Sequence, residues 1–430
     1  MRPRKRTIGI ALGVAGALTL PTAPAGAADG ETDLLHLELN LGLHGQKARV
    51  MSVVYDYFEA RDKGWLGPQQ SSTALSALKK HGDAVAEQPE KFAAGPAAIA
   101  DKAAEEQGLQ ATQVLTGFAR DSRVKFRGRT ATVTITSGTD LTWNDTALGE
   151  SSLDDTYTVT LTREKKNWRI TDVAYAPIPS TESEGFNVPT GLEDLLPLSD
   201  TAPAEANVLA AGTYDRDKAA QYADKWSQGN GSYVDKNGRE IGDGEPRYNP
   251  DYEQFDNNCA NFVSQALHAG GWPKAGGWNK DDDNNWTDNL TGPRGPSTTW
   301  SVAYRLWTYA INDSRGERLR TWPPDDPNGD NQDVWSLEKG DLLFADWDPY
   351  GAADGQIDHA MIITGRYTSQ GFTEPTYSQN TPHRNNLPLS IGMKIATGDK
   401  PDVDPGTGMG GQGRAPIYYP VHIKDTFETD

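Results

Sequence analysis

The pattern of apolar and polar residues changes character in the first half of the chain. Apolar residues in 46–62 recur every three or four positions, the spacing of one helical face. Apolar and polar residues then alternate on both sides of Gly128, which is typical of a β-hairpin. The predicted helices are 46–62, 72–82 and 91–107, and the predicted strands lie in 124–135, 157–161 and 168–173. Helices followed by antiparallel strands predict a small α+β region.

A second set of elements follows a segment rich in Pro, Ser, Thr, Glu and Ala, residues 177–212, which has the composition of a linker. Beyond it, apolar stripes predict a helix at 214–226 and a second helix within 255–267 that starts at about Cys259, and a third helix is expected around 300–311. Strand-like runs come last, at 341–344, 359–364 and 373–379. This half is also predicted to be α+β.

These changes of pattern predict how the chain is divided. The expected parts are a signal peptide at 1–27, an N-terminal α+β domain at 28–176, the linker at 177–212 and a C-terminal domain at 213–424. The order of elements in the N-terminal domain resembles small cystatin-like or NTF2-like modules. Such a resemblance in fold carries no functional conclusion.

The first 27 residues have the layout of a secretory signal peptide. A basic start that includes Arg2 and Lys5 precedes a short apolar run, and Ala25-Gly26-Ala27 offers a cleavage site. The run is short for a bilayer span, and we find no other candidate span. We expect a secreted, extracellular protein in the cell-wall space, with no membrane partner after cleavage.

Charge excludes one class of partner. The formal net charge of −19 becomes −23 once the four basic residues of 1–27 are removed. So acidic a chain repels phosphate backbones, and we expect no nucleic-acid partner.

Cys259 is the only cysteine among 430 residues, so it has no intramolecular disulfide partner. It lies in FDNNCANFVSQAL, where Asp256 to Asn258 are candidate helix caps and the residues from Phe262 on form an apolar stripe. Backbone N–H groups at a helix start favour a thiolate and stabilise an oxyanion. This position predicts a nucleophile, whereas a structural cysteine would fit better on the apolar stripe.

A nucleophilic cysteine needs a base and a residue that orients that base. His359 opens the apolar run of DHAMIITG, where it can be held rigidly at the edge of a cleft. His268 lies nine residues beyond Cys259 on the same helix, too far away to act. The next predicted strand ends at Asn380, which is the first choice for orienting His359, with His383 in reserve.

Other residues are candidates for substrate binding rather than for chemistry. Trp272, Trp278 and Trp286 lie in a polar loop and could stack on a ligand, and His383 is a further candidate. The sequence contains no Cys/His zinc spacing, phosphate-binding loop or GxSxG elbow, so we predict no metal and no cofactor.

Four segments in this order carry a family resemblance: NCANFVSQALHAGGWP, GDLLFADW, IDHAMIITG and YSQNTPHRNNLPL. Residues 213–422 resemble the amidase-domain family of secreted bacterial proteins, which is similar to papain-like cysteine hydrolases of the NlpC and CHAP types. The resemblance implies a papain-like fold with Cys259 as nucleophile and His359 as base. Asn380 stands where that family usually has a histidine.

The resemblance and the predicted export together imply a hydrolase of amide bonds in peptidoglycan, either in stem peptides or between muramic acid and alanine. The chemistry would pass through a thioester acyl-enzyme. Two alternatives stay open. One is a cysteine transacylase or deamidase that acts on a protein, and the other is an inactive module that binds the wall or a partner.

Overall fold

The computed structural model describes residues 30–80, 85–176, 211–227, 233–241, 248–291, 295–312, 315–322, 333–346, 356–396 and 416–428. The predicted signal peptide and residues 177–210 of the predicted linker lie outside these ranges. Contacts divide the chain into residues 1–47 and 48–430. The first unit is described from Gly30 on and is helical. All contacts discussed below lie within the second unit.

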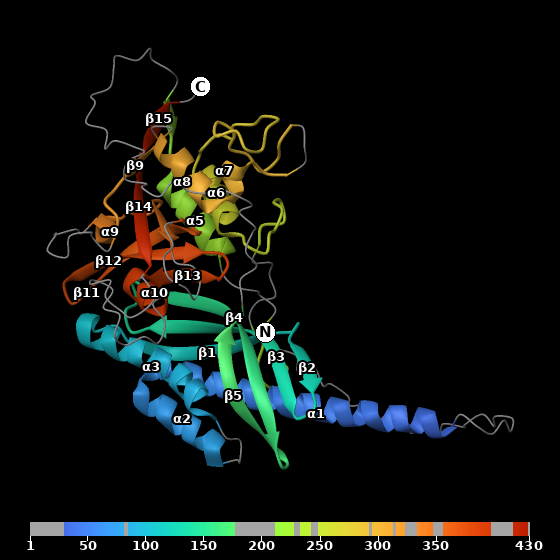
Figure 1. Cartoon of the computed structure of the whole chain (residues 1–430). Coiled ribbons are helices and arrows are strands. Elements are labelled where there is room, and N and C mark those ends of the chain that lie inside the picture. Colours follow the sequence, from blue (N-terminus) through green and yellow to red (C-terminus); the bar gives the residue numbers. More distant parts are fainter. Residues whose placement is uncertain are drawn as a thin grey trace, which may run out of the picture. The chain divides into compact units, whose positions relative to one another are not determined.

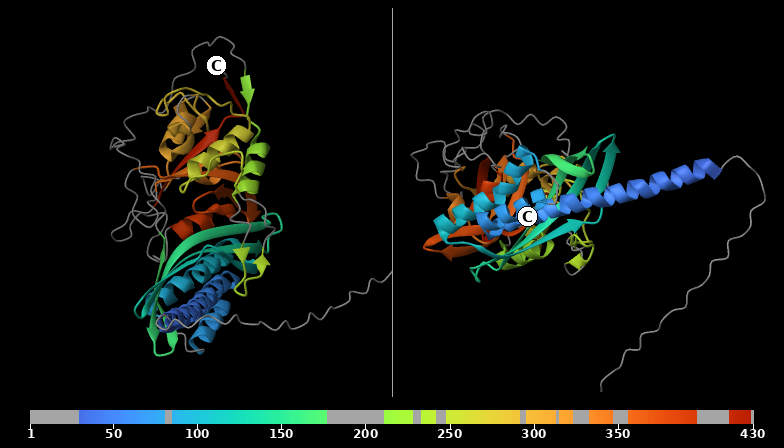
Figure 2. Two further views of the ribbon diagram at one scale, coloured as in Figure 1. Left: turned by 90° about the vertical axis from the view of Figure 1, so that its right-hand side faces the viewer. Right: turned by 90° about the horizontal axis from the view of Figure 1, so that it is seen from below.

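Helices precede strands in the N-terminal region, as the sequence predicted. The elements are α1 (Gly30–Asp62), the 3-10 turn η1 (Lys63–Leu66), α2 (Pro68–Lys80), α3 (Glu87–Gln107), β1 (Ala111–Ala119), β2 (Arg123–Arg127), β3 (Thr130–Trp143), β4 (Glu150–Glu164) and β5 (Asn167–Tyr175). Gly128, with a φ of 62°, turns the chain between β2 and β3. Figure 2 shows the blue helices against one face of the green strands, where Val54 and Phe58 pack with Val133.

The C-terminal region begins with short elements and helices. They are β6 (Ala211–Thr213), α5 (Arg216–Trp226), β7 (Tyr233–Val234), β8 (Glu240–Ile241), α6 (Cys259–Ala269), α7 (Thr298–Ser301), α8 (Ala303–Asn312), β9 (Gly316–Arg318) and α9 (Asp333–Ser336). The helices predicted at 214–226, 255–267 and 300–311 are therefore present as α5, α6 and α8.

Antiparallel strands dominate the rest of the chain. They are β10 (Leu342–Asp346), β11 (His359–Ser369), β12 (Phe372–Gln379), β13 (Arg384–Pro388), β14 (Ile417–Ile423) and β15 (Thr426–Glu428), with α10 (Leu389–Ala396) after β13. The sheet runs in the order β13-β12-β11-β10-β14-β9. Figure 1 labels β9, β11, β12, β13 and β14 among these strands.

Both faces of this sheet are buried. Phe344 and Ile362 point to a core shared with α6 and α8, whereas their neighbours Leu343 and Met361 point to a second core. The second core includes Leu109 and Leu141 of the N-terminal region. The helix that carries Cys259 is therefore packed on one face of the sheet, and the N-terminal region packs on the other.

The two regions share one mixed helix-and-sheet framework, because β13 pairs with β4 through Arg384↔Leu153 and Asn385↔Ser152. A 13-stranded sheet results. The division into separate domains at 28–176 and 213–424 stays a prediction, as does the papain-like class of the C-terminal part.

A buried ion pair reinforces this junction. The Nη2 atom of Arg384 donates to both carboxylate oxygens of Asp155, at 2.9 and 3.1 Å. Its Nη1 atom donates to the carbonyl oxygens of Asp154, at 2.9 Å, and His383, at 2.8 Å. Arg384 thus ties β4 to the segment that follows β12.

We expect Asp155→Ala to lower the free energy of unfolding by about 3–5 kcal/mol, because it leaves the Arg384 guanidinium buried without its carboxylate. Chemical denaturation measures the change. Asp172→Ala, which removes an exposed carboxylate from β5, is the matched control and should change stability by less than about 0.5 kcal/mol. Equal losses in the two variants would contradict a structural role for the pair.

Candidate active site

Cys259 is the first residue of α6, as the sequence predicted, and only 4% of it is exposed. Phe262, Val263, Ala266 and Leu267 anchor the same helix in the core. The Cys259 Sγ atom lies 3.7 Å from the carbonyl oxygen of Asp358, to which it donates. The backbone N–H of Ala360 also faces the sulfur. The main chain on both sides of His359 therefore contacts the candidate nucleophile. The His359 side chain itself lies on the face of the sheet that it shares with its partner Ala345 and with Met361, which is the face opposite α6.

Burial sets the protonation state of the sulfur. It raises the pKa of the Cys259 thiol to about 11, and the N–H groups of Ala360 and Ala260 only partly oppose that rise. This corrects the expectation that the helix start favours the thiolate. Removal from water destabilises the thiolate by more free energy than the backbone N–H groups contribute to stabilising it.

His359 opens β11 and is 3% exposed. Burial lowers the pKa of its imidazole to about 3; the side chain of Gln379 opposes this effect, and the charge of Arg384 adds to it. The imidazole is therefore neutral at neutral pH and can accept a proton. The resting pair is a neutral thiol and a neutral imidazole rather than a thiolate and an imidazolium.

Gln379, the last residue of β12, is a neighbouring side chain that raises the pKa of His359 against the effect of burial. It is fully buried, and its Nε2 atom donates to the carbonyl oxygen of Pro382 at 2.9 Å. Sequence reasoning missed Gln379, although it is the immediate neighbour of the chosen Asn380. The β12–β13 register shifts between Tyr377 and Gln379, and such a shift changes which of two adjacent residues faces a given side.

Asn380 is bonded elsewhere, which corrects its expected place beside His359. Its Oδ1 atom lies 2.9 Å from Nδ1 of His383, and Nε2 of His383 lies 2.7 Å from the hydroxyl of Tyr248. Burial lowers the pKa of His383 to about 4, so this ring is also neutral at neutral pH. The sequence offered no signal for Tyr248, which is distant along the chain.

The predicted aromatic ligand candidates separate into two groups. Trp272 and Trp286 are fully buried in the core around α6, and Trp286 donates from Nε1 to the Ser264 hydroxyl at 3.2 Å. The expectation of ligand stacking is wrong for these two rings, because core partners cover them. Trp278 is 75% exposed. It stays a candidate for ligand stacking.

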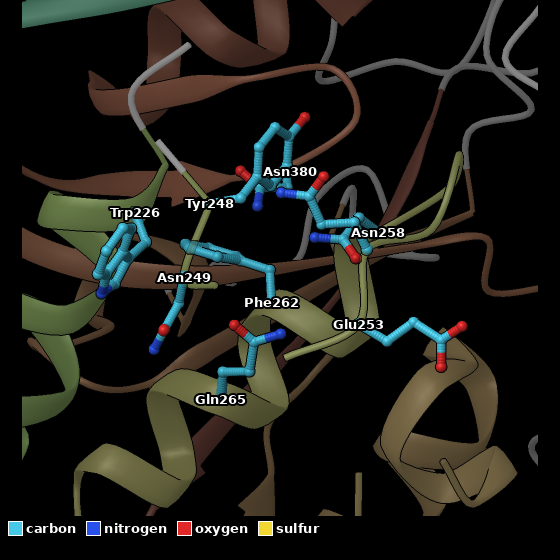
Figure 3. Close-up of a pocket in the computed structure, with 9 residues that line it drawn as sticks. Trp226, Tyr248, Asn249, Glu253, Asn258, Phe262, Gln265 and Asn380 are labelled. Atoms are coloured by element: carbon cyan, nitrogen blue, oxygen red, sulfur yellow. The ribbon is translucent and has the colours of Figure 1, made fainter. Parts of the chain in front are cut away.

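A pocket lies at the start of α6. Asn258, the residue before Cys259, lines it together with Asn380, Tyr248, Phe262 and Gln265 (Figure 3). The backbone N–H of Asn258 donates to the Thr381 hydroxyl at 3.2 Å, which holds the Cys259 helix against the segment after β12. Asn258 therefore links this pocket to the start of the Cys259 helix, although the side chains of Cys259 and His359 do not line the pocket.

Within the described ranges, no three His, Cys, Asp or Glu side chains gather in a way that could hold a metal ion. Nor does any described helix combine the length and apolar character that a membrane span requires.

Comparison with known proteins supports an amidase-like domain in this region. Residues 213–399 match the family described as "Putative amidase domain". The chain is also 28% identical over 197 residues to the uncharacterized protein YhbB of Bacillus subtilis (strain 168). That alignment covers 45% of this chain and 51% of YhbB, so the chain spans about half the length of that relative. The family match contains Cys259, His359 and Gln379.

We expect alkylation of Cys259 by iodoacetamide to be very slow at pH 6 and to accelerate about tenfold per pH unit between pH 7 and 10, because only the thiolate reacts. Intact-protein mass spectrometry measures the rate. The same chain unfolded in urea is the control, and its rate should level off near the ordinary thiol pKa. A plateau below pH 7 in the folded protein would contradict a buried, protonated thiol.

Proposed function

We propose that this chain is a cysteine-dependent hydrolase of amide bonds, with Cys259 as nucleophile and His359 as general base. The contact of the Cys259 sulfur with the backbone on both sides of His359 is the observation behind this proposal, which requires the imidazole to turn towards α6 from the face of β11 that it shares with Met361. The amidase-like match of residues 213–399 supports it, because amide hydrolysis is the reaction that such a match suggests. A papain-like arrangement of helix, base strand and orienting residue is part of the proposal.

Burial dictates the order of the first step. Because the thiol is protonated and the imidazole neutral at rest, the proton passes from Sγ to His359 as the sulfur–carbon bond forms. The N–H groups at the start of α6 are candidate donors to the resulting oxyanion. Collapse of this intermediate breaks the carbon–nitrogen bond, and the imidazolium returns its proton to the leaving amine. Water, activated by His359, then hydrolyses the thioester.

Two sequence features support the proposed substrate and the proposed location of the protein. Residues 1–27 have the layout of an export signal, and the family resemblance points to secreted bacterial proteins. We therefore propose that the protein works in the cell-wall space and cleaves stem-peptide bonds or the muramoyl–alanine amide of peptidoglycan.

One observation bears on the alternatives. Cys259 and His359 are 4% and 3% exposed, so water has little access to them at rest. A dry site suits a transacylase, in which a bound amine rather than water takes the acyl group from the sulfur. A deamidase releases ammonia and still needs water to hydrolyse the thioester, so dryness does not favour it. A dry site also suits a binding module in which the cysteine is an ordinary buried side chain.

We expect the protein to release fragments from purified peptidoglycan, and Cys259→Ala to release none, because the variant has no sulfur to form the thioester. Mass spectrometry of the soluble products reads the new amine and carboxyl termini and so identifies the bond. Release by both proteins would exclude a cysteine mechanism, and release by neither would exclude peptidoglycan as substrate.

Two further variants compare the candidate orienting residues in the same assay. Gln379→Ala should lower kcat by about tenfold or more with little change in KM, because it frees the His359 ring to rotate. Asn380→Ala is the matched comparison, because it also truncates a buried carboxamide side chain at the end of β12. It removes a hydrogen bond to His383 rather than an interaction with His359, so it should lower kcat less than Gln379→Ala does. The opposite ranking would restore Asn380 as the orienting residue.

A further inference from the structure

The pocket at the start of α6 contains three buried carboxamides. Asn258, Gln265 and Asn380 line it and are 2%, 5% and 2% exposed, respectively. A carboxamide offers an oxygen that accepts and a nitrogen that donates. For Asn258 and Gln265, the surrounding hydrogen bonds determine which of these two atoms remains for a ligand.

The orientation of Asn258 is fixed by a group that can only donate. The backbone N–H of Phe255 lies 3.3 Å from Asn258 Oδ1, and Asn261 Nδ2 donates to the same oxygen at 2.8 Å. The orientation of Asn261 is fixed in turn, because the indole N–H of Trp300 donates to Asn261 Oδ1 at 2.6 Å. The nitrogen of Asn258 is therefore the atom left over, and no hydrogen bond occupies it among the described residues.

A longer chain of hydrogen bonds fixes Gln265. The backbone N–H of Asp251 donates to Asn249 Oδ1 at 3.0 Å, so Asn249 Nδ2 is the donor to the Tyr222 hydroxyl, also at 3.0 Å. That hydroxyl then donates its own proton to Gln265 Oε1 at 2.7 Å. The Nε2 atom of Gln265 remains for the pocket and has no hydrogen-bond partner among the described residues.

The third carboxamide bonds to groups that can either donate or accept. Asn380 Oδ1 lies 2.9 Å from Nδ1 of His383, and Nε2 of His383 lies 2.7 Å from the Tyr248 hydroxyl. With the Asn380 oxygen turned to His383, Nδ1 is the donor of the ring and Nε2 its acceptor. The amide nitrogen of Asn380 is left without a hydrogen-bond partner among the described residues. All three buried carboxamides thus offer N–H donors, and Phe262 and Trp226 add apolar surface to the same pocket (Figure 3).

We infer that this pocket binds the carbonyl groups of a short, neutral peptide segment of the substrate beside Cys259. Buried N–H donors without partners need acceptors, and peptide carbonyls are acceptors without charge. Glu253 on the same pocket disfavours a carboxylate and can accept a peptide N–H. Hydroxyl-rich sugars fit less well, because their O–H groups would require acceptors. The role of this pocket in catalysis rests on the proposed function. The binding of peptide carbonyls to the pocket does not depend on it.

The size of the pocket fits one part of a larger substrate. Its empty volume of about 200 Å³ includes open solvent, so the pocket has room for a small group such as a carbonyl rather than for a whole ligand. Asn258 and Gln265 lie seven residues apart on or next to α6, about two turns or ~10 Å along its axis. Such a spacing suits an extended chain that offers successive carbonyls rather than a single compact group.

The test measures binding in the full-length Cys259→Ala chain, so that no turnover is needed. The probe is N-acetyl-trialanine amide, which is neutral and rich in carbonyls, and titration is followed by calorimetry or NMR. Gln265→Glu, added to this chain, keeps the oxygen that Tyr222 requires and replaces the N–H donor with a carboxylate oxygen. Gln113→Glu is the matched control, because it adds the same charge at an exposed position on β1.

We expect saturable binding of the probe to the parent chain. The affinity should be at least about tenfold weaker in Gln265→Glu, because this variant loses one hydrogen bond from a buried donor and gains a repulsive contact with the probe carbonyl. The affinity should be unchanged in Gln113→Glu. Circular dichroism shows whether the Gln265→Glu variant folds. If it does not, Gln265→Met replaces it, because this variant removes the N–H donor without adding a charge and should also weaken binding of the probe. No binding by the parent chain, equal affinity in a folded Gln265 variant, or binding of N-acetylglucosamine alone would overturn the inference. Failure of the proposed hydrolysis would appear only in the peptidoglycan assay and leaves this binding test unaffected.

Discussion

The buried pair of Arg384 and Asp155 is the contact on which the candidate site depends most. Arg384 begins β13, and its guanidinium also holds the carbonyl oxygen of His383. The short segment between β12 and β13 is therefore fixed at one end by a residue of β4. That segment follows Gln379, which interacts with His359, and includes Asn380, which lines the pocket. Asp155 lies outside the family match of residues 213–399. The N-terminal region thus contributes to the site through structure, although no candidate catalytic residue lies in it.

Burial explains the chemistry of the site as well as its stability. The same removal of water raises the pKa of Cys259 and lowers that of His359, so both groups are uncharged at rest. In the proposed mechanism, proton transfer from Cys259 to His359 therefore accompanies attack on the acyl group instead of preceding it. Beside it, the donor-rich pocket is polar and uncharged apart from Glu253. The arrangement favours a substrate bound through neutral amide groups over one drawn in by charge.

The sequence predicted those parts of the site that depend on local pattern. The apolar stripe after Cys259 identified its helix, and the apolar run after His359 identified its strand. Asn380 was preferred to Gln379 because no residue pattern records the register shift between Tyr377 and Gln379 at the end of β12. Trp272 and Trp286 were misread because their loop is polar, whereas the rings themselves turn into the core.

The pairing of β4 with β13 joins residues more than 200 positions apart and left no local signal. The thiol pKa was misjudged because burial, which sequence does not give, outweighs the helix start.

The most direct measurement of the central claim is the intact mass of the protein, quenched with acid during incubation with soluble peptidoglycan fragments. The account predicts a fraction of molecules carrying an acyl group on Cys259, removable by neutral hydroxylamine as a thioester is, and absent from Cys259→Ala. Turnover of the fragments with no adduct on Cys259, at a rate that Cys259→Ala retains, would contradict it.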